Sequence, residues 1–297
     1  MELQARPEDE GARLDAFLAG PLGSRARAQR LIAAGAVLVD GAVMPKRHRV
    51  VTGELVTVDE DADGWAAPIA EAAADVPFGV AYEDDHLLVV DKPAGVVVHP
   101  ARGHWGGTLS QALAGRAAGG EAGRAGIVHR LDRETSGLLV VAKSEAVHRA
   151  LKAALQRREL TREYLALVEG RPPARTGTID APIGRDRRVR TRMSTDTDDP
   201  REARTHFVLE RALPATTLLR VWLETGRTHQ IRAHLQAIGH PVVGDPEYGT
   251  AGLLGLERQF LHAARLAFVH PVTGEPVDVS SPLPDELRRA LDRAAAA

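Results

Sequence analysis

The sequence predicts an α+β protein with a mixed, mostly antiparallel sheet and a small α/β module at its N-terminus. In the larger part of the chain, strand-like segments outnumber helical ones and do not alternate with them strictly, which favours a mixed sheet over a doubly wound one. No repeat of fixed period is present. The N-terminal part begins with two short helical segments that lead into short strands. A length of 297 residues accommodates one sizeable core and a small appended domain.

Composition excludes several classes of protein. The hydrophobic content of 44% and the charged content of 26% are those of a globular protein. Cysteine is absent, which excludes disulfides, thiolate metal sites and cysteine nucleophiles. No apolar run approaches the roughly 20 residues of a membrane span, and the acidic N-terminus has no apolar signal core. We therefore expect a cytoplasmic protein without membrane contact, and a monomer by default.

The N-terminal module is predicted to span residues 12–59. Ser24 stands where an N-cap belongs, before a helix over residues 25–33, and Gly35 ends that helix. Asp40 and Gly41 form a tight-turn signal after a short strand, which indicates a hairpin. The module is also locally basic on a chain of net charge −2, which suggests a polyanionic partner.

Three arginines stand near the start of the second helix of this module. Arg25, Arg27 and Arg30 lie where backbone N–H groups also favour phosphates. Three arginines alone are better explained as an ordinary solvated helix face. An acidic, alanine-rich segment over residues 60–75 follows the module and is predicted to be a linker. The larger domain is predicted over residues 76–297.

Hydrophobic runs and capping residues indicate the elements of the larger domain. Strands are expected over residues 138–141, 163–168 and 218–224. A helix is expected after Ser144, and another over residues 228–238 with Ile231, Leu235 and Ile238 facing inward. A terminal helix is expected over residues 287–295. The arginine-rich stretch over residues 185–192 has the composition of a basic hairpin arm, and an acidic run follows it.

One polar cluster lies at the mouth of a buried strand. Asp132 stands between Arg130 and Arg133, and a Thr-Ser-Gly turn separates it from the apolar run of residues 138–141. An R-x-D-R pattern in isolation is usually a surface ladder of ion pairs. A carboxylate fixed at the mouth of a buried strand, with a cation beside it to keep it ionised, is instead typical of a site.

Other chemistries lack their motifs. His229 and His234 are five residues apart on a predicted helix, about 140° from each other, and HExxH does not occur. The nucleophile elbow GxSxG and the phosphate-binding loop GxxxxGK[ST] are missing too. The sequence therefore supports neither a metal site, nor serine acyl transfer, nor nucleotide hydrolysis.

Several motifs together resemble a known family. HRLDRETSG, preceded by KPAGVVVHP and followed by EYLALVEG, GRTHQIRAHLQAIGHPVVGDPEYG and LHAARLAFVHP, resembles the RluA-type pseudouridine synthases, which isomerise uridine in RNA. The resemblance covers nearly all of residues 77–282. The N-terminal SRxRxxxLIxxGxVxVxG pattern resembles the S4 RNA-binding module, as in the RluC/RluD branch that acts on large-subunit ribosomal RNA. The resemblance implies the pseudouridine synthase fold, no cofactor, and ribosomal RNA or an assembling subunit as partner.

The resemblance also implies roles for individual residues. Asp132 matches the catalytic aspartate, as a nucleophile at the sugar or as a base, and Arg232 matches its ion-pair partner. Tyr164 matches the tyrosine that stacks on a flipped-out uracil and moves a proton at C5. Arg130 matches the residue that fills the vacated space in the RNA, and Leu261 matches an apolar wall of the pocket. In the module, Arg25, Arg27 and Arg30 are then expected to contact RNA.

Further residues are expected to position the site. His129, Thr135 and Ser136 lie beside Asp132 in sequence, and His229 shares a predicted helix face with Arg232. Two other functions stay open at this point. One is a non-catalytic RNA-binding or ribosome-assembly factor that uses the S4-like module. The other is a hydrolase that releases free uracil.

Overall fold

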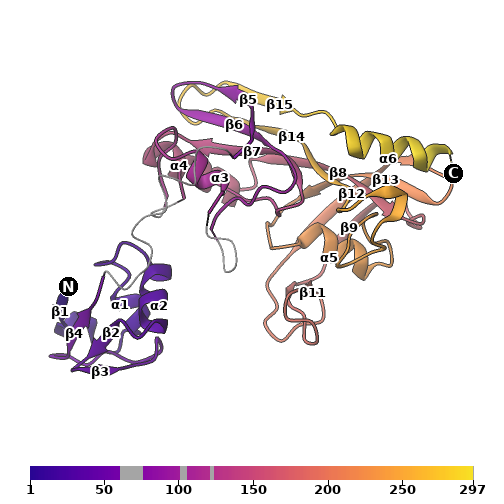
Figure 1. Ribbon diagram of the computed structural model, residues 1–297. Helices are drawn as coiled ribbons and strands as arrows, with labels where there is room; N and C mark the ends of the chain where they lie inside the picture. Colours follow the sequence, from indigo (N-terminus) through magenta and orange to yellow (C-terminus); the bar gives the residue numbers. More distant parts are fainter. Residues whose placement is uncertain (61–75, 101–105, 121–123, 297) are drawn as a thin grey trace. The chain divides into compact units, whose positions relative to one another are not determined.

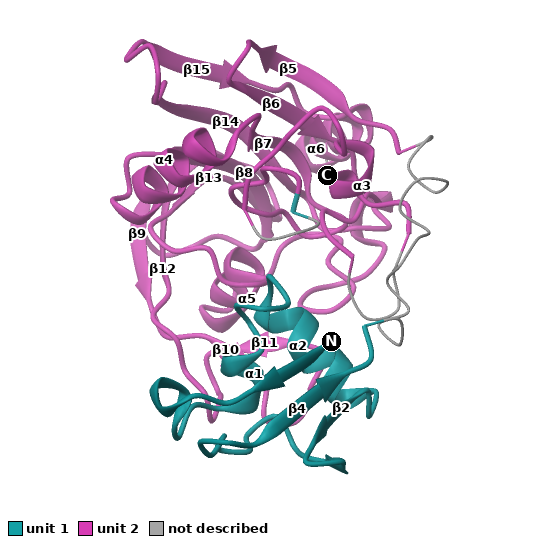
Figure 2. Ribbon diagram, turned by 90° about the vertical axis from the view of Figure 1, so that its left-hand side faces the viewer, with its two compact units in different colours: residues 1–74, 121–124 teal, residues 75–120, 125–297 magenta. Residues whose placement is uncertain are grey.

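The computed structural model describes residues 1–60, 76–100, 106–120 and 124–296, and the chain divides into two compact units (Figure 1 and Figure 2). The first unit comprises Met1–Ala74 with Glu121–Arg124, and the second comprises Asp75–Gly120 and Ala125–Ala297. The predicted linker over residues 60–75 lies outside the described residues except for Glu60. Each unit is built around cores of its own.

The small unit is a four-stranded sheet, of order β1-β4-β2-β3, with two short helices. Ser24 accepts a hydrogen bond from the N–H of Arg27, which confirms the predicted N-cap of α2. Asp40 and Gly41 both have positive φ, as a tight hairpin turn requires. β1 pairs with β4, so the sheet also includes residues that precede the predicted module of residues 12–59. The elements are β1 (Glu2–Gln4), η1 (Pro7–Asp9), α1 (Leu14–Phe17), α2 (Arg25–Ala33), β2 (Val37–Val39), β3 (Ala42–Val43) and β4 (Leu55–Val58).

The large unit is organised around a nine-stranded sheet, as predicted for a mixed and mostly antiparallel architecture (Figure 1). Its order is β5-β6-β7-β14-β8-β13-β12-β9, with β15 paired to β14 outside this path. Within this sheet only β7 and β14 run parallel, and they do so over two residue pairs. The strands are β5 (Gly79–Glu83), β6 (Leu87–Lys92), β7 (Ser136–Ala142), β8 (Thr161–Glu169), β9 (Thr176–Asp180), β12 (Arg204–Ala212), β13 (Thr216–Leu223), β14 (Leu261–Val269) and β15 (Pro276–Ser280).

Helices pack against this sheet through their apolar sides. Val147 and Leu151 of α4 belong to a core with β6 and β7 residues. Leu109 of α3 and Leu287 of α6 belong to the larger core, which also holds Leu235 of α5. A separate short hairpin, β10 with β11, forms the hairpin arm, residues 184–194. The remaining elements are α3 (Leu109–Ala112), α4 (Glu145–Gln156), β10 (Gly184–Arg185), β11 (Met193–Ser194), α5 (Gln230–Ala237), η3 (Leu253–Gly255) and α6 (Asp285–Ala296).

The parallel contact between β7 and β14 brings together the parts of the chain that carry the predicted site. Gly137 pairs with Ala263, and Ala263 pairs in turn with Tyr164 of β8. A Cβ atom on Gly137 would lie 2.2 Å from the carbonyl oxygen of Ala263, and the residue has φ of +111°. Glycine is therefore required for this close approach of two backbones. The loop that carries Asp132 enters β7 at this contact.

We expect Gly137→Ala to lower the free energy of unfolding by about 3 kcal/mol or more, because the new methyl group both strains the backbone and collides with β14. Gly239→Ala is the matched control, since Gly239 has a similar positive φ but open space around it. It isolates the backbone term, which costs about 1 kcal/mol. Chemical denaturation measures both variants, and equal losses would contradict the predicted collision.

Candidate active site

The structure brings Asp132 and Arg232 together although 100 residues separate them in sequence. Nη1 of Arg232 lies 3.4 Å from Oδ2 of Asp132. The guanidinium comes from α5, and the carboxylate comes from the loop before β7. The side chain of Arg232 is 5% exposed and that of Asp132 is 17% exposed. The pair is therefore a buried cation with a carboxylate at the edge of solvent.

Two further carboxylates hold Arg232 more tightly than Asp132 does. Asp245, which is fully buried, accepts from Nε at 2.6 Å and from Nη2 at 2.9 Å, and Glu247 accepts from Nη2 at 2.7 Å. Burial opposes the charge of Arg232, but the bond to Asp245 and the nearby carboxylates outweigh it and raise the pKa of Arg232. Asp132 is thus the most loosely held of three carboxylates, which leaves its oxygens available to a substrate.

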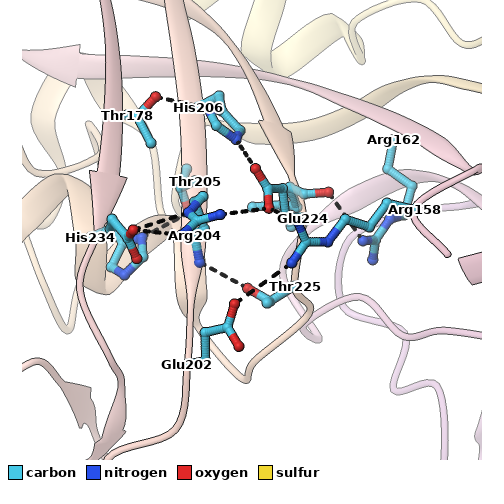
Figure 3. A network of polar contacts seen from close by, with 12 residues as sticks. Arg158, Arg162, Thr178, Glu202, Arg204, Thr205, His206, Glu224, Thr225 and His234 are labelled. Carbon is cyan, nitrogen blue, oxygen red and sulfur yellow. Dashed lines mark hydrogen bonds and ion pairs between the residues drawn. The ribbon is translucent and has the colours of Figure 1, made fainter. Parts of the chain in front are cut away.

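A buried polar network fixes α5, and with it Arg232, against the sheet (Figure 3). Gln230 donates to the carbonyl oxygen of Arg204 at 3.0 Å and to the hydroxyl of Thr205 at 3.1 Å. His234 bonds the same hydroxyl at 2.8 Å through Nδ1 and the carbonyl oxygen of Ala181 at 2.8 Å through Nε2. His234 is accordingly a structural residue that ties α5 to β12.

Glu224 joins three elements around the loop that leads into α5 (Figure 3). Its carboxylate pairs with Arg158 at the end of α4, and it accepts from His206 at 2.7 Å and from Arg204 at 3.1 Å. The ring of His206 stacks on Trp222, with centroids 5.4 Å apart. This network holds the end of β13 in place, from which the chain continues to Arg232.

A buried lysine anchors the loop that carries Asp132. Lys92 is fully buried and donates to the carbonyl oxygens of Pro93 at 2.8 Å, Val96 at 2.9 Å and Arg133 at 2.9 Å. Burial lowers the pKa of Lys92 to about 7. Three carbonyl oxygens match the three donors of an ammonium group. The KPAG segment is therefore bonded directly to the backbone next to Asp132.

Arg258 and Gln259 bind the same loop from the other side. Arg258 donates to the carbonyl oxygen of Glu134 at 2.8 Å and to the hydroxyl of Ser136 at 3.2 Å. Gln259 donates to the hydroxyl of Thr135 at 3.2 Å. Thr135 and Ser136 thus serve to position the loop. The sequence reasoning missed Arg258 and Gln259, because nothing in their local pattern distinguishes them from ordinary loop residues.

His129 lies at the opposite end of this loop. Its Nε2 accepts a long hydrogen bond of 3.4 Å from the N–H of Val140 in β7. Burial, with the charges of Arg162 and Lys152, lowers the pKa of His129 to about 3, so the ring is neutral near pH 7. A neutral acceptor suits this bond, and His129 fastens the loop to the sheet.

Tyr164 and Leu261 lie on the strands behind Asp132. Tyr164 is 5% exposed and pairs across the sheet with Ala263, while Leu261 is 3% exposed and begins β14. Burial raises the pKa of Tyr164, Arg162 opposes that shift, and the charge of Asp132 adds to it. The phenol is therefore protonated near neutral pH. Both side chains belong to the large apolar core of this unit, and Tyr164 adds one hydroxyl to it.

Arg130, unlike the neighbouring residues of the loop, has an exposed side chain without an ion-pair partner among the described residues. It lies two residues before Asp132, on the same loop. The arrangement leaves a long cationic side chain exposed on the loop that carries Asp132.

In the small unit, a buried carboxylate organises the basic residues. Asp15 is fully buried and accepts from Nε of Arg13 at 2.9 Å, from Nε of Arg25 at 3.1 Å and from Gln29 at 2.6 Å. The predicted RNA-binding residue Arg25 is therefore held by an internal partner. Arg27 lies 3.7 Å from Glu60, and Arg30 is on the same helix, α2. The sequence reasoning missed the role of Asp15.

The predicted helix over residues 228–238 was too long at its start. α5 begins at Gln230, and His229 stands before it with a left-handed backbone, φ +54° and ψ +20°. The helical spacing that predicted a shared face for His229 and Arg232 therefore does not apply. Its ring nevertheless lies near Glu247, with Nδ1 3.6 Å from the carboxylate. Ile238, predicted to face inward, is 38% exposed because the helix ends before it.

Neither a metal-binding group of side chains nor a membrane-spanning helix occurs among the described residues. No group of three or more His, Asp or Glu side chains among them is arranged to hold a metal ion. No helix in the same parts of the chain is long and apolar enough to cross a membrane.

Comparisons with known proteins decide the family. A family model described as RNA pseudouridylate synthase matches residues 86–237, and a model described as S4 domain matches residues 12–56. A Xanthomonas campestris pv. campestris protein named ribosomal large subunit pseudouridine synthase D is 44% identical over 95% of this chain and 88% of that protein. The chain belongs to the RNA pseudouridine synthase family. It is an RluA-type pseudouridine synthase with an N-terminal S4 domain, and thus an intramolecular isomerase.

Other similar proteins also carry names of RNA pseudouridine synthases. A Chloroflexus aurantiacus protein named as an uncharacterized RNA pseudouridine synthase is 48% identical over 96% of this chain and 90% of that protein. The solved structure of human RNA pseudouridylate synthase domain containing 1 is 32% identical, with a TM-score of 0.56 over 70% of this chain and 84% of that chain. The pseudouridine synthase fold inferred from the sequence motifs is confirmed.

We expect Arg232→Lys to lower kcat by about 100-fold or more, because one ammonium group cannot bind Asp245 through two bonds and still reach Asp132. Arg227→Lys is the matched control, since Arg227 lies in the loop just before α5 and is exposed, and its side chain bonds only the carbonyl oxygen of Glu202 among the described residues. Single-turnover pseudouridine formation measures both. A fully active Arg232→Lys enzyme would show that the bidentate geometry is dispensable.

We expect Asp15→Asn to destabilise the S4 domain by about 2 kcal/mol, because a buried amide accepts more weakly than a carboxylate from Arg13, Arg25 and Gln29. Hydrogen exchange resolved by segment measures the effect, with faster exchange in α2 and unchanged exchange in β7. Glu8→Gln is the control, since the side chain of Glu8 is 67% exposed. Unchanged exchange in α2 would contradict the structural role of Asp15.

Proposed function

We propose that this pseudouridine synthase isomerises uridine in large-subunit ribosomal RNA, with Asp132 as its catalytic carboxylate. The names of the Xanthomonas campestris relative and of similar proteins in Nitrosomonas europaea and Vibrio vulnificus support the substrate. The S4 domain supports an RNA partner. Either free ribosomal RNA or an assembling subunit fits this proposal, and the cytoplasm is then the place of action.

The contact between Asp132 and Arg232 is the observation that carries the catalytic assignment. Pseudouridine formation breaks the bond between C1′ and N1, turns the uracil and joins C5 to C1′. A carboxylate serves this chemistry because it can attack or stabilise a sugar centre with oxocarbenium character, or act as a base. Arg232 keeps Asp132 ionised and oriented, while Asp245 and Glu247 satisfy the rest of the guanidinium.

The surroundings of Asp132 fit a flipped-out base. A uridine must leave its stack to reach a site against the sheet. In this proposal the ring of Tyr164 stacks on the uracil, and its hydroxyl exchanges a proton at C5. Leu261 forms an apolar wall, and the exposed Arg130 enters the space that the base leaves.

We expect Asp132→Asn to abolish pseudouridine formation, lowering its rate at least about 1,000-fold, while RNA binding persists. Pseudouridine mapping on large-subunit ribosomal RNA, presented both free and in precursor particles, measures the activity. Asp292→Asn is the control, because Asp292 is an exposed residue of α6. Retained modification by Asp132→Asn would remove Asp132 from the mechanism.

The product distinguishes the proposed reaction from its competitors. Isomerisation leaves the mass of the RNA unchanged, whereas hydrolysis at the same bond releases free uracil. Modification confined to another class of RNA would overturn the substrate assignment and leave the enzymatic one intact. Binding without any modification by the wild-type protein would indicate a non-catalytic assembly factor.

A further inference from the structure

Tyr248 lies at the junction of the hairpin arm and the catalytic pair. It follows Glu247 and is 6% exposed. Its ring centre is 4.8 Å from the guanidinium carbon of Arg232 and 4.6 Å from that of Arg192 in the arm. One aromatic ring is thus in cation–π contact with two arginines, one from the active site and one from the arm.

The hydroxyl of Tyr248 makes two hydrogen bonds of different kinds. The backbone N–H of Met193, on β11 of the arm, lies 2.8 Å away and can only donate. Nδ1 of His229 lies 3.0 Å away and can either donate or accept. Because the hydroxyl already accepts from Met193, its own proton is satisfied when it is donated to Nδ1. The opposite assignment leaves a buried phenol proton with no acceptor among the described residues.

This arrangement determines the form of the histidine. An imidazole that accepts at Nδ1 is neutral and carries its proton on Nε2. Burial lowers the pKa of His229, despite the charge of Asp132, and burial raises the pKa of Tyr248 to about 12, so both groups are neutral near pH 7. No residue that the structure describes accepts a hydrogen bond from Nε2 of His229. A donor is therefore left available beside the catalytic carboxylate.

The backbone of His229 is consistent with a constrained role. It has left-handed dihedral angles, which a non-glycine residue adopts only when its surroundings enforce them. Glu247, which binds Arg232, also lies 3.6 Å from Nδ1 of His229. The ring stands edge-on to Tyr248, with an interplanar angle of 89°. Tyr248 and His229 thus form a fixed pair next to Arg232.

The arm itself presents cations to solvent. Arg188 and Arg190 are exposed and have no carboxylate partner among the described residues. The acidic run that follows does not neutralise them, since Asp196 and Asp198 bind Arg187 instead, at 3.0 and 2.8 Å. Figure 1 shows the arm beside α5. Its exposed cations fit the phosphates of a bound RNA.

We propose that Tyr248 is a positioning residue that couples the hairpin arm to the active site, by holding His229 as the neutral tautomer protonated on Nε2. RNA phosphates bound at Arg188 and Arg190 hold the arm, the arm holds the hydroxyl of Tyr248 through Met193, and that hydroxyl directs Nε2–H to the substrate side. This inference rests on the proposed role of Asp132, since the Nε2–H of His229 is directed to the substrate that binds at Asp132.

The tautomer is tested on the protein alone, by nitrogen NMR of the His229 imidazole, assigned by comparison with His229→Gln. We expect an unprotonated Nδ1 and a protonated Nε2 in the wild type, and exchange between both tautomers in Tyr248→Phe, which keeps the ring between the arginines. Tyr82→Phe is the matched control, because Tyr82 bonds Asp84 away from these residues. A proton on Nδ1 in the wild type, or an unchanged tautomer in Tyr248→Phe, overturns the proposal.

The coupling is tested kinetically with large-subunit ribosomal RNA transcripts. We expect Tyr248→Phe to lower kcat on the order of 10-fold to 100-fold with little change in KM. The double variant Arg188→Gln, Arg190→Gln should raise KM and lower kcat, and in the Tyr248→Phe background only the KM effect should remain. Additive losses in kcat overturn the coupling. Absence of pseudouridine with the wild type is a failure of the proposed substrate, and the NMR result is independent of it.

Discussion

A guanidinium group taken out of water is the constraint on which the active site depends. Arg232 is almost fully buried, and a buried charge is tolerated only when its donors are satisfied by partners of opposite charge. Asp245 and Glu247 meet this need, and the helix that carries Arg232 is fixed by Gln230 and His234. Because Asp245 and Glu247 accept from Nε and Nη2 of Arg232, Asp132 contacts only Nη1, through one long hydrogen bond.

The loop of Asp132 is held through its backbone, and the carboxylate that we propose to be catalytic keeps its oxygens largely free. Lys92 and Arg258 each donate to a carbonyl oxygen of the loop, at Arg133 and at Glu134. Such contacts hold the loop without competing for the oxygens of the Asp132 carboxylate. In the proposed mechanism, backbone atoms of this segment therefore position the carboxylate, and its side-chain oxygens stay available for the reaction.

Much of this arrangement was predictable from the sequence. The rest depends on tertiary contacts that the local sequence does not reveal. Ser24 and Ser144 correctly predicted where α2 and α4 begin. The HRLD and QIR motifs predicted the ion pair of Asp132 with Arg232, which the structure contains. Asp245 and Glu247 were not predicted because carboxylates in a turn look like solvent-exposed residues until a buried cation is placed beside them. His229 lies near Arg232 as expected, but its placement inside the helix was wrong, because its backbone is left-handed and local sequence cannot show that.

The parallel contact of β7 with β14 has a consequence for when activity arises. Ser136 and His262, which meet there, are 126 residues apart in sequence, and the contact orders the loop of Asp132 against the last third of the chain. Contacts between such distant segments form late, because closing the long loop between them costs conformational entropy before the contacts can stabilise the fold. During synthesis the S4 domain and the first strands emerge well before β14 does. The loop of Asp132 thus gains its contact with β14 only after the ribosome has synthesised the chain through that strand.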